Sequence, residues 1–306
     1  MNAFHAADLG VEFAACLPLP SKIDPHFEAS LRHILENPGN LVRPRIVYQV
    51  ATAYGLSIAC AKDLAIALEY FHTASLLFDD LPCMDNAVRR RGVPCVHLAY
   101  GESGAILAAL ALINRAYGLA WRAASACPGA RQTRALTYIE DRLGVRGILD
   151  GQSLDLNYAA LPHDGETTQR IAFGKTVSLI RLTLVLPAIL GGASDQEVRL
   201  LERIALYWGL SYQIADDLKD VLQSTTETGK TAARDELLDR PNTAIVLGIP
   251  AAVSRLVRLI RLGDKTLDRL LVTAPACAFL GKLRDDLEAE VTSVTHDALE
   301  LTLAVQ

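Results

Sequence analysis

Apolar residues recur with helical spacing along most of this chain. Over residues 46–69 they point in almost every direction around a helix, which predicts one buried helix there. Similar patterns predict helices at residues 104–124, 133–150, 168–190, 195–221 and 251–270. The sequence has no convincing alternation of apolar and polar residues between turn signals, so a β-rich fold is disfavoured. The pattern therefore predicts an all-α fold.

Proline and glycine mark short breaks between the predicted helices. The breaks lie at Pro38-Gly39, Pro82, residues 92–94, Pro128-Gly129, residues 161–165, Gly191-Gly192 and residues 225–241. None has the length or the Ser/Gly content of a linker between domains. The chain has 306 residues, of which 51% are apolar, and this is enough to bury a large core. We therefore predict a single all-helical domain over residues 1–306.

Net charge, cysteine spacing and the first twenty residues argue against a nucleic-acid-binding, secreted or membrane protein. The net charge of -5 argues against a nucleic-acid partner, because broad phosphate binding needs a basic excess. The six cysteines include no CxxC pair, which favours reduced thiols. The first twenty residues contain Asp8 and Glu12 and no Lys or Arg, unlike a secretory or organelle signal. The longest apolar run, residues 105–113, is about half of the ~20 residues that a membrane span needs. We expect a cytoplasmic protein with no transmembrane segment.

Two clusters of aspartates interrupt apolar helical sequence. The first contains Asp79, Asp80 and Asp85, and the second contains Asp216, Asp217 and Asp220. Crowded carboxylates repel one another and lose hydration unless a cation compensates them. Clustered carboxylates without His or Cys partners suit Mg²⁺. Each cluster alone is also compatible with a solvated helix end, and the presence of two favours the metal.

The spacing within each cluster indicates how it can reach one ion. Asp216 and Asp220 are four residues apart, so both lie on one helical face. Asp79 and Asp85 are six apart, and Pro82 between them should end or kink the helix and let Asp85 return towards Asp79.

Basic residues accompany both clusters. They are Arg43 and Arg45, the run Arg89-Arg90-Arg91, and Lys175, Lys230 and Arg240. Local cations beside paired acids in an acidic protein fit a metal-bridged diphosphate, whose oxygens are shared between the metal and the guanidinium or ammonium groups.

The stretch from His72 to His97, with its run DDLPCMD, resembles the first aspartate-rich motif of trans-prenyl diphosphate synthases. Residues 212–220 (YQIADDLKD) resemble the second, and residues 151–155 (GQSLD) and Lys175-Thr176 match further motifs in the expected order. The resemblance covers about residues 43–248 and is strongest to bacterial farnesyl and geranylgeranyl diphosphate synthases. It implies an isoprenoid synthase helical bundle around a deep apolar cavity, a homodimer, and coupling of an allylic diphosphate to isopentenyl diphosphate.

The resemblance also implies a role for each matching residue. Asp79, Asp85, Asp216 and Asp220 would hold three Mg²⁺ ions, with Asp80 and Asp217 as further or supporting ligands. Arg90, Lys175, Lys230 and Arg240 would hold the allylic diphosphate, and Arg43, Arg91 and His97 the isopentenyl diphosphate. Thr176 and Gln213 would flank the developing allylic cation.

The resemblance extends to product length, through Ala74 and Ser75. These residues precede Asp79 by about one helical turn, and their side chains would point down the cavity. A bulky aromatic residue at the position of Ala74 closes the pocket at fifteen carbons in the family. Alanine there leaves room, which favours a twenty-carbon product, geranylgeranyl diphosphate.

The sequence departs from the family mainly around the acceptor site. Asn40 stands where the family has a lysine that would contact isopentenyl diphosphate, and Val93 replaces a basic residue. These changes leave a second hypothesis open, a terpene synthase that ionises and cyclises a prenyl diphosphate without isopentenyl diphosphate. Retention of Arg43, Arg91 and His97 favours coupling. A third hypothesis is a non-catalytic partner subunit, which has little reason to keep both aspartate clusters.

Overall fold

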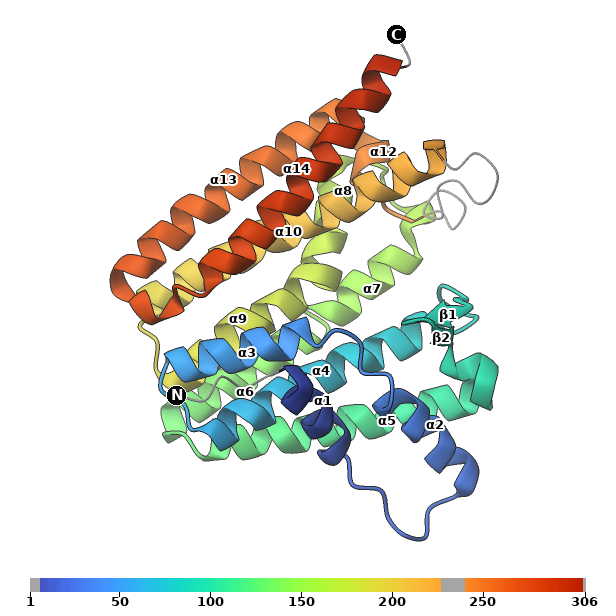
Figure 1. Ribbon diagram of the computed structural model, residues 1–306, viewed down its shortest axis with the longest axis vertical. Coiled ribbons are helices and arrows are strands. Elements are labelled where there is room, and N and C mark those ends of the chain that lie inside the picture. Colours follow the sequence, from blue (N-terminus) through green and yellow to red (C-terminus); the bar gives the residue numbers. More distant parts are fainter. Residues whose placement is uncertain (1–5, 227–239, 305–306) are drawn as a thin grey trace. The chain divides into compact units, whose positions relative to one another are not determined.

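The computed structural model describes the backbone of residues 6–226 and 240–304, and side chains over residues 9–222 and 240–296 (Figure 1). These residues divide into two compact units, which we describe separately. Unit 1 comprises residues 1–136 and 187–192, and unit 2 comprises residues 137–186 and 193–306. The interpretation of residues 1–306 as one domain stays a prediction.

Unit 1 is built around the buried helix α4. Its elements are α1 (Ala6–Ala15), α2 (Pro25–Leu35), α3 (Val42–Ala53), α4 (Ile58–Asp79), β1 (Arg89–Arg90), β2 (Val93–Pro94), α5 (Val96–Ser125) and the start of α6 (Gly129–Leu143). Helix α4 packs against α3 and α5, and α2 packs against α5. Because α4 is buried on nearly all sides, polar residues on it need partners from neighbouring elements.

Unit 2 centres on the long helix α10. Its elements after α6 are α7 (Ile148–Leu156), η1 (Tyr158–Ala160), α8 (Gly165–Ala172), the π-helix η2 (Phe173–Val177), α9 (Ser178–Gly191), α10 (Asp195–Thr226), α12 (Thr243–Leu247), α13 (Ile249–Thr273), η3 (Pro275–Cys277) and α14 (Leu280–Ala304). Helix α10 packs against α13 and α14 (Figure 1) and also against η2, while α7 packs against η2.

The predicted all-α fold is confirmed, and the only strands among the described residues are the two short ones of the β1–β2 hairpin. The single helix predicted over residues 46–69 is wrong, because α3 ends at Ala53 and α4 begins at Ile58. Between them Gly55 has a φ of 76°, and the Ser57 hydroxyl caps α4 by accepting from the Cys60 N–H. The helix predicted over residues 133–150 also breaks, between α6 and α7. Residues 168–190 are helical but divide into α8, the π-helix η2 and α9, and the other three predicted helices are confirmed.

Two helical stretches are long and apolar enough to cross a membrane, judged by length and composition alone. They are Val96–Ser125 and Gly165–Gly191, and 39% and 72% of their most apolar windows are buried. Buried core helices of globular proteins have the same length and composition. The expectation of no transmembrane segment therefore stays a prediction. All six cysteines are free in the structure, and the reduced thiols expected from the sequence stay a prediction.

Candidate functional site

The first aspartate cluster lies where α4 ends. The helix ends at Asp79, and the chain then folds back so that the Asp85 N–H donates to the Asp79 carbonyl oxygen at 2.9 Å. Asn86 follows with a φ of 46°, a left-handed conformation that asparagine tolerates better than most residues. The predicted return of the chain after the proline is thus confirmed at the backbone.

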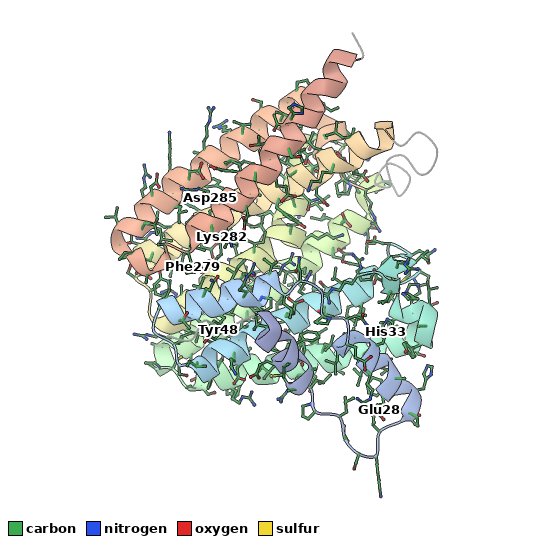
Figure 2. All side chains as sticks on the ribbon, in the orientation of Figure 1. Glu28, His33, Tyr48, Phe279, Lys282 and Asp285 are labelled. Atoms are coloured by element: carbon green, nitrogen blue, oxygen red, sulfur yellow. The ribbon has the colours of Figure 1, made fainter. Side chains whose placement is uncertain are left out.

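The β1–β2 hairpin brings Arg90 to the buried carboxylate of Asp80. Arg90 donates to Asp80 Oδ1 through Nη2 at 2.5 Å and through Nε at 3.0 Å. Asp80 is only 2% exposed, and the two-pronged ion pair compensates its burial. On α2 the ring of His33 (Figure 2) lies 3.0 Å from the carbonyl oxygen of Pro94 and fixes the end of the hairpin. Asp80 therefore orients Arg90.

Arg91 is held by a buried glutamate that the sequence analysis did not select. Its Nη2 lies 3.2 Å from Glu69 Oε1, and its Nη1 donates to the Asn37 carbonyl oxygen at 3.1 Å. The guanidinium also passes against Gly39, where an added Cβ would lie 2.6 Å from Arg91 Nε. Burial raises the pKa of Glu69 to about 7, although the charges of Arg91 and Arg43 act in the opposite direction.

His72 contacts a second arginine of the expected acceptor site. Arg43 Nη1 lies 2.9 Å from His72 Nε2, and because arginine can only donate, this ring nitrogen accepts. Burial, and then the charge of Arg43, lowers the pKa of His72 to about 2, so its ring is neutral. Both ring nitrogens of His97 are buried without a hydrogen-bond partner in the described part of the chain. His97 is therefore able to receive a polar ligand atom.

Glu69 and His72 are the acceptor-side residues that sequence reasoning missed. A signal was present, because Glu69-Tyr70-Phe71-His72 places two polar side chains one turn apart within an otherwise buried helix. Their partners lie elsewhere in the chain, on α3 and on the hairpin, and the sequence pattern of α4 does not indicate them.

In unit 2, two glycines let α7 approach the π-helix η2. A Cβ on Gly151 would lie 2.2 Å from the Lys175 backbone nitrogen, and one on Gly174 would lie 2.7 Å from Gly151 Cα. The close approach places Lys175 Nζ 2.7 Å from Asp155 Oδ2. Arg240 Nη1 donates to the Asp155 carbonyl oxygen at 3.1 Å and lies 3.6 Å from Asp155 Oδ2. Asp155, which is 5% exposed, thus holds two of the predicted diphosphate-binding cations together.

A chain of hydrogen bonds links η2 to α10 and α12. Thr176 Oγ1 donates to Gln213 Oε1 at 2.7 Å, and Gln213 Nε2 donates to Asp217 Oδ1 at 2.9 Å. Asp217 Oδ2 accepts from the Thr243 N–H at 2.8 Å. Asp217 is 2% exposed, so its carboxylate supports the local fold and orients Gln213. A π-helix is often found where side chains converge on a functional site.

The remaining acids of the second cluster fit a hard divalent cation. Asp216 and Asp220 lie one turn apart on α10, and Asp220 Oδ2 is buried with no hydrogen-bond partner among the described residues. Burial raises the pKa of Asp216. The charge of Lys219 opposes this effect, and the charges of Glu290 and Asp220 add to it. A cation would satisfy the orphaned oxygen and favour the ionised carboxylates. The donors present therefore fit Mg²⁺.

The two clusters belong to different units. Asp79 and Asp85 lie in unit 1, and Asp216 and Asp220 lie in unit 2. No group of three or more His, Cys, Asp or Glu side chains is arranged to hold a metal ion within the residues that the structure describes. The expectation that the clusters face each other and share three Mg²⁺ ions stays a prediction.

The remaining predicted site residues are Ala74, Ser75 and Lys230. Ala74 is fully buried in α4, and the half-buried Ser75 donates its hydroxyl to the His72 carbonyl oxygen at 2.8 Å. Lys230 lies outside the described residues.

Known proteins of one family match most of this chain. The polyprenyl synthetase family matches residues 24–266. The chain is 36% identical over 248 residues to geranylgeranyl pyrophosphate synthase 7, chloroplastic, of Arabidopsis thaliana, which covers 80% of this chain and 70% of that protein. It is 34% identical over 246 residues to the geranylgeranyl pyrophosphate synthase, chloroplastic, of Catharanthus roseus, covering 80% and 68%.

Solved structures agree with the sequence matches. An FPP/GFPP synthase from Zymomonas mobilis aligns with a TM-score of 0.73 at 27% identity and covers 89% of this chain and 92% of that one. A geranyltransferase from Helicobacter pylori complexed with magnesium and isoprenyl diphosphate aligns with a TM-score of 0.74 at 25% identity, covering 96% and 98%. The predicted isoprenoid synthase fold is confirmed, and the chain belongs to the polyprenyl synthetase family.

Proposed function

We propose that this chain is a Mg²⁺-dependent prenyltransferase that couples an allylic diphosphate to isopentenyl diphosphate. The observation that carries the proposal is the acceptor-side network of unit 1. Arg43 and Arg91 are each held by a buried partner, His72 and Glu69 respectively. Burying a charged pair costs desolvation free energy, and the pair gives the guanidinium a fixed position. A fixed pair of guanidiniums suits a substrate that carries a diphosphate.

The chain's own residues would have two tasks in the reaction: they bind the diphosphate, and they keep water away from the allylic cation. Arg90, Lys175 and Arg240 would bind the leaving diphosphate, two of them in positions set by Asp155. Mg²⁺ bound by the aspartates would neutralise the negative charge that develops on this diphosphate. The oxygens of Thr176 and Gln213 would face the allylic cation, and the apolar helices exclude water that would quench it. The acceptor's double bond then forms the new C–C bond, and the departed diphosphate takes the proton that is lost.

The product we propose is geranylgeranyl diphosphate. Ala74 is 0% exposed, and its small side chain adds little volume to the apolar interior of α4. Curated relatives named geranylgeranyl pyrophosphate synthase support this choice, although the chain spans only 63–70% of the length of the first two of them.

We propose a homodimer that uses an exposed apolar face of α5. Five side chains on one side of this helix are 37–56% exposed, namely Ile106, Leu107, Leu110, Tyr117 and Trp121. Contiguous apolar surface of this kind is typical of protein–protein interfaces. A cytoplasmic location is proposed as well, supported by the six cysteines that form no disulfide.

Product analysis separates coupling from cyclisation. The protein is incubated with Mg²⁺ and farnesyl diphosphate, with and without isopentenyl diphosphate. Coupling gives elongated diphosphates only when the acceptor is present. Hydrocarbons or alcohols formed without the acceptor would instead identify a terpene synthase, the alternative favoured by Asn40. The exposed side chain of Asn40 accepts from the Val42 N–H at 3.4 Å. Absence of turnover with every primer would favour a non-catalytic subunit.

A further inference from the structure

Three arginines line one cavity where α10 begins and α13 ends. Arg199 and Arg203 lie one turn apart on α10, and Arg269 lies in the last turns of α13. With Gln196, Leu200 and Val272 they line a cavity of about 430 Å³. This volume lies in the range of small-molecule sites. The cavity lies wholly within unit 2 and shares no residue with the site described above.

These three guanidinium groups have no direct partner in the described part of the protein. None of them forms a hydrogen bond or ion pair with a described residue, whereas Arg181 and Arg240 in the same unit are both paired. Like charges that line one cavity repel one another. In a protein with a net charge of -5, such a cluster stands out as a local basic site.

Two of the carboxylates that neighbour the arginines on α10 are engaged elsewhere. Glu197 accepts from the Ser194 N–H and hydroxyl, both at 2.7 Å, and so caps the helix. Glu202 forms an ion pair with Arg181 at 2.6 Å. On α13, Asp268 precedes Arg269 and is exposed, and it is the acid that opposes the cluster from this helix.

Basic residues continue along the exposed side of α13. Arg258, Arg261 and Lys265 are exposed and follow at intervals of three and four residues, which places them on the same side of the helix as Arg269. The opposite side of α13 is apolar and buried against the core cluster of unit 2. Asp264 lies between the basic residues in sequence, and burial together with the nearby charge of Glu288 on α14 raises its pKa to about 6. The stripe of positive charge thus leads into the arginine cavity.

We propose that the cavity between α10 and α13 binds a phosphate group through Arg199, Arg203 and Arg269, with Leu200 and Val272 contacting an apolar part of the ligand. Guanidinium groups match phosphate oxygens in pairs, and three of them are suited to a doubly charged group. Val272 is 82% exposed, which leaves it available for such a contact. A soluble phosphate ester and a phospholipid headgroup offer the same chemistry.

The test compares two triple variants of the full chain that lose the same charge. One removes the cavity cations (Arg199→Gln, Arg203→Gln, Arg269→Gln), and the control removes Arg32, Lys282 (Figure 2) and Arg284, each replaced by Gln outside the cavity. One arm titrates inorganic phosphate by calorimetry in the absence of Mg²⁺. The other measures flotation with phosphatidylcholine vesicles that contain or lack phosphatidylglycerol.

The proposal predicts that the cavity variant loses about tenfold or more in affinity in one arm and that the control matches wild type. Loss in the phosphate arm identifies a soluble ester, and loss in the vesicle arm identifies a lipid headgroup. Equal binding by wild type and the cavity variant in both arms overturns the proposal. Asp268→Asn tests it without removing a cation, since loss of the opposing charge should tighten binding, and unchanged or weaker binding counts against the proposal.

Discussion

Glu69 Oε1 and Arg91 Nη2 lie 3.2 Å apart beneath the β1–β2 hairpin, in a pair whose carboxylate is almost entirely buried. Arg91 itself has a φ of 53°, an uncommon conformation for a non-glycine residue. The pair and the Asn37 carbonyl fix the direction of the guanidinium. Glu69 therefore acts on the acceptor site by positioning Arg91.

Glu69→Gln should weaken acceptor use selectively. At pH 8, above the pKa of Glu69, the carboxylate is ionised. The amide keeps the shape of the side chain but removes the charge that holds Arg91, at a cost of about 1.5–3 kcal/mol. We expect the KM for isopentenyl diphosphate to rise about tenfold to a hundredfold, while the KM for the allylic diphosphate stays close to wild type. The control is Asp63→Asn on the same helix, which breaks the surface pair with Arg122. Equal effects on both substrates would contradict the positioning role.

The free energy of unfolding should depend on pH partly through Glu69. Its pKa is about 7 in the folded protein, against an ordinary value of 4.5. Between these values the folded state binds more protons than the unfolded state, so stability falls as the pH rises through this window. The full difference corresponds to about 3 kcal/mol. Urea unfolding at pH 5 and pH 8 should show a larger loss in wild type than in Glu69→Gln, and identical losses would contradict it.

Asp155→Asn should affect the allylic side. Lys175 and Arg240 both lose the carboxylate that holds them, so the KM for the allylic diphosphate should rise and kcat should fall. We expect about a tenfold loss in kcat/KM at minimum. Asp150→Asn on the same helix is the control, because its pair with Arg170 is exposed. Steady-state kinetics with each substrate varied in turn checks the assignment, and a change confined to isopentenyl diphosphate would refute it.

Ala74→Phe should shorten the product. The larger ring would occupy interior space beside α4 that the growing chain needs, so product analysis should shift from twenty carbons to fifteen. Ala74→Ser adds one oxygen atom and is the control expected to keep the wild-type chain length. If the phenylalanine variant folds and gives an unchanged product, other residues set the limit of chain length.

The charged residues of the site can be predicted from the sequence, but most of the contacts that hold them in position cannot. The aspartates and arginines are visible because charged residues interrupt apolar helical sequence. In the sequence, Asp155 is visible only as part of the GQSLD motif, because its role depends on Lys175, twenty residues later, and on Arg240. Such partners are set by packing, in this case by the glycine contact between α7 and η2, which no local pattern reports.

The errors in the predicted helices have a similar cause. The apolar pattern of residues 46–69 continues across the break and therefore predicts one helix. The single Gly55 is a weak local signal, yet its left-handed backbone and the Ser57 cap separate α3 from α4. The sequence pattern does not predict helix α14, because acidic residues are frequent in it and its apolar stripe is modest.

Binding of isopentenyl diphosphate tests the central claim most directly. Calorimetry with wild type, Arg91→Gln and Asn40→Lys, without an allylic substrate, asks whether the acceptor site works despite Asn40. We predict saturable binding by wild type, about tenfold or greater weakening by Arg91→Gln, and tighter binding by Asn40→Lys, which restores the expected cation. Absence of binding to wild type, or equal affinity for wild type and Arg91→Gln, would contradict the account.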